Sequence, residues 1–352
     1  MSDRILIGTR KGLVTMTRGP KGYGVDGIDH RGIPVAYAAV MADGAWWVSL
    51  DHGHWGPKLQ RSCDEGRTWD AVEPPSYPDE AGVTLESVWV IASGHPEQPG
   101  RVWMGTVPGG LFRSDDSGDH FELVSSLWDH PTRAKSWFGG GRDTAGIHSV
   151  VVDPRDANRV LIGVSVGGVY ESTNDGASWT PRNRGLLADF LPDADVEAGH
   201  DPHQLAMVAG APDVLWQQNH CGIFRSVDGG QQWREVSQVG GPARFGFPVA
   251  VHDTDPDVAW VVPAESDATR TTIDGSLLVC RTEDGGRTWQ EQRAGLPQEH
   301  AYDVVYRHAL DRQDDELVFG STTGNVYWSG DGGDHWSALA QNLPPVYSVR
   351  WA

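Results

Sequence analysis

Side chains suited to binding a divalent metal stand at one equivalent position in three consecutive segments of the chain. When three short apolar segments are aligned, the residues that directly precede them are Glu86, His148 and His203. In the later segments the same column continues with Phe247, Tyr302 and Tyr347. Two imidazoles and a carboxylate can hold a divalent metal and leave positions open for water or substrate.

Two further histidines stand in turns that we expect to lie beside this column. His220 is a candidate fourth metal ligand, and His220, His54 and Glu86 are the candidate catalytic groups for moving protons. Asp201 stands two residues before His203 and would orient its imidazole. The alternative for each histidine is a purely structural one, in which the ring bonds a carbonyl or an ordered water and does no chemistry.

Cationic and aromatic residues in the same regions suggest how a small ligand would be bound. Arg142, Arg270 and Lys11 would hold an anionic group. Exposed aromatic rings suit a sugar-like ligand, and the candidate substrate-binding rings are Trp137 and Tyr302, with Trp55 and Trp128 nearby. A glycosidase would use two carboxyl groups about 5–10 Å apart, and Glu86 with Glu265 or Asp201 is the candidate pair.

The element that must position these residues is an eight-residue motif that occurs six times. Its first copy reads Ser62-Cys-Asp-Glu-Gly-Arg-Thr-Trp69. In this motif Asp turns the chain by bonding its own backbone, Gly permits a left-handed conformation, and the aromatic residue packs beneath the turn. The other copies span residues 114–121, 172–179, 226–233, 282–289 and 329–336.

The motif recurs at one place in a longer unit of four short strands, A to D, in which it joins C to D. Such a four-stranded meander is a propeller blade. A seventh blade is predicted from residues 1–32, which supply strands B and C, and residues 345–352, which supply strand A. The fold class is therefore all-β: residues 1–352 form one seven-bladed β-propeller of antiparallel blades, closed by the C-terminal strand so that no sheet edge stays open.

In such blades the six motifs lie on one face of the propeller. The B–C turns and D–A connections lie on the opposite face, and the longest and least regular of them are there. We therefore expect the candidate metal and its ligands at the mouth of the central channel, on the face opposite the motifs.

The motif S-x-D-x-G-x-T-W is the Asp box, or BNR repeat, and the whole chain resembles bacterial Asp-box propellers often labelled sialidase-like, glycosyl-hydrolase-like or WD40/YVTN/BNR-like. It is more distantly similar to photosystem assembly propellers and to the sortilin ectodomain. The resemblance implies the fold and leaves the activity open. Sialidases resemble six-bladed propellers with an Arg-Ile-Pro motif, whereas Arg31-Gly-Ile-Pro34 carries an inserted glycine.

Composition restricts the partners. The 48 acidic residues exceed the 28 basic ones, giving a net charge of −20. Such a surface repels phosphate backbones and anionic lipids, so we expect no nucleic-acid and no membrane partner. The three cysteines form no disulfide framework and the N-terminus lacks the pattern of a signal peptide, which together favour the cytoplasm. A monomer or a dimer is expected.

Three functions are compatible with these features. The first is a small-molecule hydrolase or lyase with a divalent metal of unspecified identity at the channel mouth. The second is a glycoside hydrolase with paired carboxylates. The third is a non-catalytic scaffold that binds a protein or another ligand on the same face.

Overall fold

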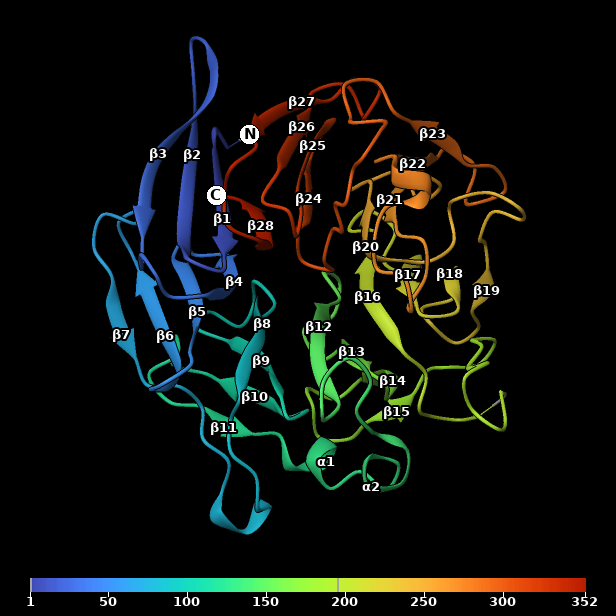
Figure 1. Cartoon of the computed structure of the whole chain (residues 1–352). Helices are drawn as coiled ribbons and strands as arrows, with labels where there is room; N and C mark the ends of the chain where they lie inside the picture. Colours follow the sequence, from blue (N-terminus) through green and yellow to red (C-terminus); the bar gives the residue numbers. More distant parts are fainter. Residues whose placement is uncertain (1, 195) are drawn as a thin grey trace.

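The computed structural model describes residues 2–194 and 196–352, which form seven four-stranded antiparallel sheets arranged around a centre (Figure 1). From the inner strand outward, blades 1 to 4 contain β28 (Val346–Trp351), β1 (Arg4–Thr9), β2 (Gly12–Gly19) and β3 (Gly22–Asp29); β4 (Val35–Val40), β5 (Trp46–His52), β6 (Gly56–Ser62) and β7 (Asp70–Val72); β8 (Ser87–Ser93), β9 (Val102–Val107), β10 (Leu111–Ser114) and β11 (Glu122–Leu123); and β12 (Gly146–Val152), β13 (Val160–Ser165), β14 (Gly168–Ser172) and β15 (Thr180–Pro181).

Blades 5 to 7 repeat the same order of strands. They contain β16 (Pro202–Met207), β17 (Leu215–Asn219), β18 (Gly222–Ser226) and β19 (Arg234–Glu235); β20 (Gly246–Val251), β21 (Ala259–Pro263), β22 (Val279–Thr282) and β23 (Gln290–Gln292); and β24 (Leu310–Gln313), β25 (Glu316–Gly320), β26 (Val326–Ser329) and β27 (Ser337–Ala340). The short helical segments are η1 (Asp79–Ala81), α1 (Ser125–Trp128), α2 (Arg133–Ser136) and η2 (Ile273–Gly275). Among the described residues there is no helix of the length and apolarity that a membrane crossing requires.

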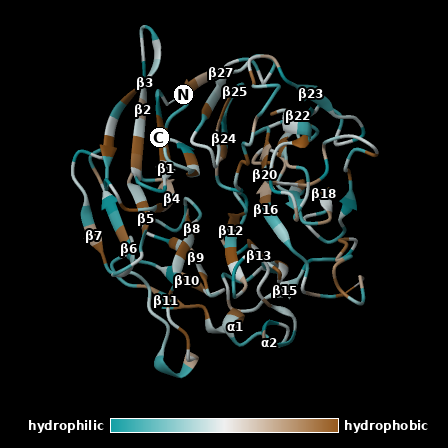
Figure 2. Cartoon of the chain, in the orientation of Figure 1, coloured by the Kyte–Doolittle hydropathy of each residue, from teal (hydrophilic) through white to brown (hydrophobic). Residues whose placement is uncertain are grey.

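The core lies between the faces of neighbouring blades. All six residues of β9 are buried, whereas the outer strand β3 has no buried residue. The inner strands contact one another in a closed ring, β4 to β8, β12, β16, β20, β24 and β28 and back to β4. In Figure 2, parts of strands such as β2 and β12 are brown, the colour of hydrophobic residues. Because each blade buries both faces against its neighbours, apolar residues dominate the inner and middle strands.

The predicted closure of the propeller is confirmed. β28 pairs antiparallel with β1, from Ile5 opposite Trp351 to Thr9 opposite Val346. The two termini therefore lie side by side in the same blade (Figure 1). The C-terminal strand covers the edge of β1, which would otherwise offer unpaired backbone groups.

The six recurring turns share one pattern of hydrogen bonds. In the first, Ser62 Oγ donates to Asp64 Oδ1 (2.9 Å) and accepts the N–H of Gly66 (2.8 Å), while Asp64 Oδ1 accepts the N–H of Thr68 (2.8 Å). Gly66 has φ of 80°, and a Cβ there would lie 2.8 Å from the Trp46 ring, so only glycine fits. The other five turns repeat these bonds and begin at Ser114, Ser172, Ser226, Thr282 and Ser329.

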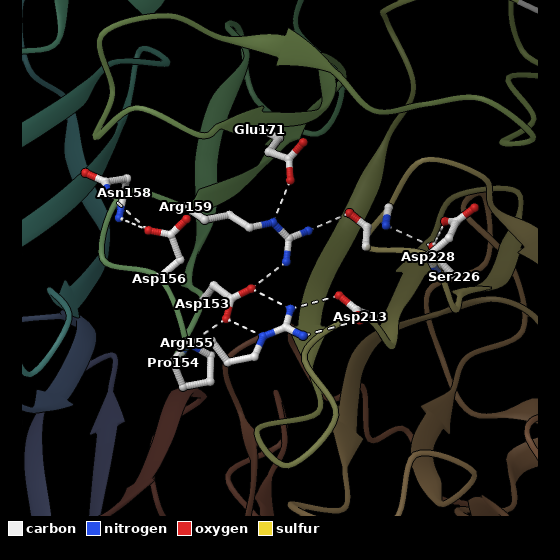
Figure 3. A network of polar contacts seen from close by, with 12 residues as sticks. Asp153, Pro154, Arg155, Asp156, Asn158, Arg159, Glu171, Asp213, Ser226 and Asp228 are labelled. Atoms are coloured by element: carbon white, nitrogen blue, oxygen red, sulfur yellow. Dashed lines mark hydrogen bonds and ion pairs between the residues drawn. The ribbon is translucent and has the colours of Figure 1, made fainter.

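Polar networks also tie neighbouring blades together at the rim. Arg159, directly before β13, bonds Glu171 Oε1 (2.6 Å) and Asp153 Oδ2 (2.7 Å) within blade 4, and donates to the carbonyl of Gly229 in blade 5 (2.7 Å) (Figure 3). Arg155 extends the network to Asp213 (2.8 Å). Since both acids within blade 4 are buried, pairing with arginine offsets the cost of removing their charges from water.

A β-bulge interrupts the inner strand near its start in six of the blades. The register of the inner strand shifts at a single place in each, and the unpaired positions include Ala36, Trp89, His148, His203, Phe247 and Tyr347. A bulge leaves one residue outside the ladder and redirects its side chain. In this ring the bulges aim side chains toward the centre of one face.

The bulges correct the alignment of the column predicted from the sequence. Val90 lies opposite Gly105 as Ser149 lies opposite Gly163, so Trp89, and not Glu86, is the equivalent of His148. In blade 7, β24 begins only at Leu310, far beyond Tyr302. The predicted column was misplaced at Glu86 and Tyr302, because short apolar segments such as 87–88 and 149–150 resemble one another in more than one register. His203, Phe247 and Tyr347 were placed correctly.

Candidate functional site

A cavity of about 810 Å³ opens at the centre of the face opposite the recurring turns. Inner-strand bulges supply part of its wall, including Trp89, His203, Phe247 and Tyr347. D–A connections and B–C turns supply the rest, including Arg142, Asp201, Asp51, His220 and Arg270. The face predicted for the site from the blade geometry is therefore the face that is hollowed, and its volume suits a small ligand.

One wall of the cavity holds a carboxylate between two imidazoles. Asp201 Oδ2 lies 3.4 Å from His203 Nε2 and 3.7 Å from His220 Nδ1. Asp201 and His203 are buried, and His220 is partly exposed toward the cavity. The three residues offer ligand atoms that all lie within 4.8 Å of one another. They come from the start of β16 and from the turn between β17 and β18, where the His220 N–H donates to the Asp201 carbonyl (2.9 Å).

The ionisation of Asp201 is set by its neighbours. Burial alone would raise the pKa of this carboxyl, but contact with His203, the charge of Arg307 and the N–H of Val166 together hold the pKa of Asp201 well below its usual range. Its other oxygen, Oδ1, accepts bonds from Val166 N (3.0 Å) and Ser165 Oγ (3.1 Å). Asp201 is therefore a fixed anion with Oδ2 facing the imidazoles.

Three arginines from three different D–A or B–C segments face the same cavity. The guanidinium groups of Arg142 and Arg307 lie over the Trp89 ring, at 4.8 and 4.3 Å from its centroid, and that of Arg270 lies 5.7 Å from the Phe247 centroid. Arg307 Nε is buried and makes no hydrogen bond to any residue that the structure describes. Burial, opposed by Asp201 and reinforced by repulsion from Arg142 and Arg270, lowers the pKa of Arg307 to about 10. This arrangement suits an anionic group of a ligand.

Asp51, at the end of β5, is a second carboxyl of the cavity, and its pKa is displaced in the opposite direction. Burial raises the pKa of Asp51, and the bonds from Ser87 Oγ (2.9 and 3.1 Å) and the charge of Arg142 offset this only in part. Asp51 thus takes up a proton more readily than Asp201 does. Two carboxyls whose pKa values are displaced in opposite directions are the usual basis of an acid–base pair.

The floor of the cavity is formed by two buried histidines. His308 of blade 7 lines the cavity and donates from Nε2 to the carbonyl of His148 in blade 4 (2.8 Å), across the centre of the ring. His148 in turn bonds Ser149 Oγ through Nδ1 (2.9 Å) and the carbonyl of Pro202 through Nε2 (2.7 Å). Because burial lowers the pKa of both imidazoles, these rings are neutral and act as structural bridges.

The structure brings together only part of the residue set predicted from the sequence. Arg142, Arg270, His203 and His220 line the cavity, whereas Glu86 is exposed before β8 and does not. The predicted metal ligand His148 has both ring nitrogens engaged elsewhere, so it does not join His203 and His220.

The remaining predicted residues lie outside this cavity. His54 and Lys11 are exposed in the turns that follow β5 and β1. Trp137 is a packing residue, since its Nε1 donates to the Tyr170 hydroxyl (2.7 Å). Tyr302 lines a smaller hollow with Glu265.

Sequence reasoning missed Asp51, Arg307 and Asp267. It gave Asp201 two alternative roles, as the group that orients His203 and as a carboxylate of a glycosidase pair. Asp267 Oδ2 lies 3.6 Å from His220 Nε2 and belongs to the same loop as Arg270. The spacing Asp201-Pro-His203 was the available signal, because residues two apart in an extended segment point to the same side.

Comparison with known proteins finds relatives of this chain but assigns it to no family. No family model matches the chain. The chain is 26% identical over 242 residues to the oligoxyloglucan-reducing end-specific xyloglucanase of Emericella nidulans. The matched region covers 62% of this chain and 28% of that protein. The chain is 24% identical over 257 residues to the xyloglucanase Xgh74A of Acetivibrio thermocellus, covering 62% and 29%. The chain therefore matches less than a third of the length of these relatives.

Solved structures are similar at the level of the fold. An ancestral GH74 enzyme matches with a TM-score of 0.58 at 16% identity, over 86% of the chain and 38% of that structure. YCF48 bound to D1 peptide matches with a TM-score of 0.52 at 15% identity, over 91% and 87%. The chain is a seven-bladed propeller whose curated relatives include xyloglucanases, enzymes that act on sugars.

Proposed function

We propose that this propeller is a glycoside hydrolase that cleaves a small, anionic, sugar-like ligand in the central cavity. The observation that carries the proposal is the opposite displacement of two pKa values in one cavity, that of Asp51 upward and that of Asp201 downward. Its relatives named as xyloglucanases support the reaction class. Xyloglucan itself is not carried over, since the match covers less than a third of those proteins.

Asp51 is the proposed general acid. Glycoside hydrolysis needs a carboxylic acid that protonates the leaving oxygen and a carboxylate on the side where water attacks. A raised pKa keeps Asp51 protonated at a pH at which Asp201 is ionised. Ser87 Oγ reaches both Asp51 oxygens and fixes the orientation of the carboxyl.

Asp201 is the proposed anion on the water side. Its Oδ1 is occupied by Val166 and Ser165, so Oδ2 is the atom left to act, either on water or on the imidazoles of His203 and His220. The sequence suggested Glu86 and Asp201 as one possible carboxylate pair. The proposed pair retains Asp201 and replaces Glu86 with Asp51.

The walls of the cavity define the ligand class. Trp89 and Phe247 line the cavity, and their rings support the three guanidinium groups that lie over them. Arg142, Arg270 and Arg307 would hold a carboxylate, phosphate or sulfate substituent. We therefore expect the ligand to be an acidic sugar derivative and not a neutral sugar.

The test is hydrolysis of a panel of chromogenic glycosides that carry uronic acid, sugar phosphate, sugar sulfate or neutral sugars. Asp51→Asn is expected to lower kcat by about 10²–10⁴ with little change in KM, because general acid catalysis contributes that much. The variant should also lose the fall in kcat at high pH, which reports deprotonation of the acid. Asp70→Asn, on the exposed outer strand β7 of the same blade, is the matched control.

Equal activity of Asp51→Asn and the unchanged protein would contradict the role of Asp51. Absence of hydrolysis across all four classes of glycoside would contradict the proposed function itself.

A further inference from the structure

The three residues Asp201, His203 and His220 are arranged as metal ligands. Each offers one ligand atom, and these atoms lie within 4.8 Å of one another at the wall of the cavity. The separations from Asp201 Oδ2, 3.4 Å to His203 Nε2 and 3.7 Å to His220 Nδ1, are longer than hydrogen bonds. Ligand atoms of a tetrahedral zinc site with bonds of about 2.0–2.1 Å lie about 3.3–3.4 Å apart. The separation from His203 matches this spacing, and the separation from His220, 3.7 Å, is slightly longer than it.

Each of the three side chains is held in the orientation that ligation requires. His203 donates from Nδ1 to the carbonyl of Gly246 (2.6 Å), which leaves the lone pair of Nε2 directed at Asp201. Asp201 is anchored through Oδ1 by Val166 and Ser165, which leaves Oδ2 free. His220 faces Asp267 with Nε2 (3.6 Å), so its Nδ1 is turned inward. Metal-ligating histidines have such carbonyl and carboxylate partners on their other nitrogen.

The immediate partners of the two histidines are carboxylates. Asp201 lies between the imidazoles and Asp267 lies beside His220, whereas the arginines of the cavity lie over Trp89 and Phe247. Phe245 and Phe247 pack against the His203 ring, with centroids 5.6 and 4.8 Å away, and shield that side from water. Because the cluster lines the cavity, the remaining coordination position faces the ligand space.

We propose that Asp201, His203 and His220 bind one divalent cation of the zinc type, with one position open to the cavity. Two imidazoles and one carboxylate favour Zn²⁺ or another borderline transition metal over Mg²⁺ or Ca²⁺. With a cation bound, Asp201 Oδ2 would act on the attacking water through the ion, which would carry and acidify that water. Only this catalytic role rests on the proposed glycoside hydrolase function, since binding of the metal does not depend on it.

The experiment is a titration of chelator-treated, dialysed full-length protein with ZnCl₂ by calorimetry, and with CoCl₂ by visible absorption. The unchanged protein is expected to bind one ion per chain, and Co²⁺ to give the intense d–d bands of a tetrahedral N/O site. His220→Gln, which removes a partly exposed ligand, should weaken binding at least about 100-fold. His54→Gln, an exposed histidine in the turn that follows β5, should bind as the unchanged protein does.

A stoichiometry well below one ion per chain, or equal affinity of His220→Gln and the unchanged protein, would overturn the site. Circular dichroism of His220→Gln checks that a loss of binding is not a loss of folding, and Asp201→Asn provides a second ligand variant. The two proposals fail separately: stoichiometric metal without hydrolysis rejects the glycosidase alone, and a stoichiometry well below one ion rejects the metal site alone. Hydrolysis that survives chelation rejects only the catalytic role of the metal.

Discussion

Replacing Arg307 with methionine should make the free protein more stable while it removes ligand affinity. The pKa of Arg307 falls from 12.5 to about 10, and the difference corresponds to about 3.4 kcal/mol against the charged form in the folded protein. A base with a lowered pKa bears this cost at every pH below about 10, so the cost is fully present at pH 7. Methionine keeps an apolar stem over Trp89, and the lost cation–π contact offsets about 1–2 kcal/mol.

The expected net gain for Arg307→Met is about 2 kcal/mol. With an unfolding entropy of about 2.1 cal/mol/K per residue over 352 residues, this gain raises Tm by about 2–3 °C. Sodium sulfate serves as the probe for the anion site, and at 100 times its Kd it should stabilise the unchanged protein by about 2.7 kcal/mol. Arg307→Met should lose most of this stabilisation.

The assay is urea and thermal unfolding at pH 7, with and without sulfate, at constant ionic strength set by sodium chloride. The control is Arg234→Met, which replaces an exposed arginine on the outer strand β19. It should change neither the free energy of unfolding nor the stabilisation by sulfate. If Arg307→Met were less stable than the control, the charge of Arg307 would not be a cost in the folded state. Equal stabilisation of both variants by sulfate would refute the three-arginine anion site.

Three further outcomes are expected. Asp51→Asn should be more stable than the unchanged protein at pH 7 in urea unfolding, since burial raises the pKa of Asp51; the difference should vanish as the pH falls below 3.8, where the carboxyl is neutral in both folded and unfolded states. Ending the chain after Pro345 should abolish cooperative thermal unfolding and cause aggregation, because β1 loses its partner β28; a soluble, cooperatively unfolding product would contradict closure by this strand. Ser172→Ala should cost about 1–3 kcal/mol in urea unfolding by leaving the N–H groups of Asn174 and Gly176 unpaired, and Ser226→Ala in the next blade should add to it independently; strongly coupled costs would show that the turns are not separate units.

The architecture was predictable because its signals are local and repeated. Each recurring turn is specified by a hydroxyl, a carboxylate or amide, and a glycine within five residues, and Ser62, Asp64 and Gly66 make the bonds that their chemistry suggests. Closure by residues 346–351 was also predictable, since one strand was missing at the start of the chain and one was left over at the end.

The site was only partly predictable because it is built from exceptions to the repeat. The residues that start the inner strands differ from blade to blade, so the true equivalent of His148, which is Trp89, could not be recognised and the alignment fell three residues early, at Glu86. Arg307 lies in a segment without strand pairing before β24, so an alignment of the inner strands does not include it. His203 and His220 were found because their own blade is regular up to the bulge, whereas Asp51 needed the Ser87 contact from the next blade to be recognised.

The hydrogen bond from His308 to the carbonyl of His148 joins opposite sides of the ring beneath the cavity. Both rings are buried, and His148 also bonds the carbonyl of Pro202, so these bonds tie blade 7 to blades 4 and 5 through the middle of the ring. The pocket is therefore braced from within as well as by its own blades, and we expect it to keep the same shape with and without a ligand.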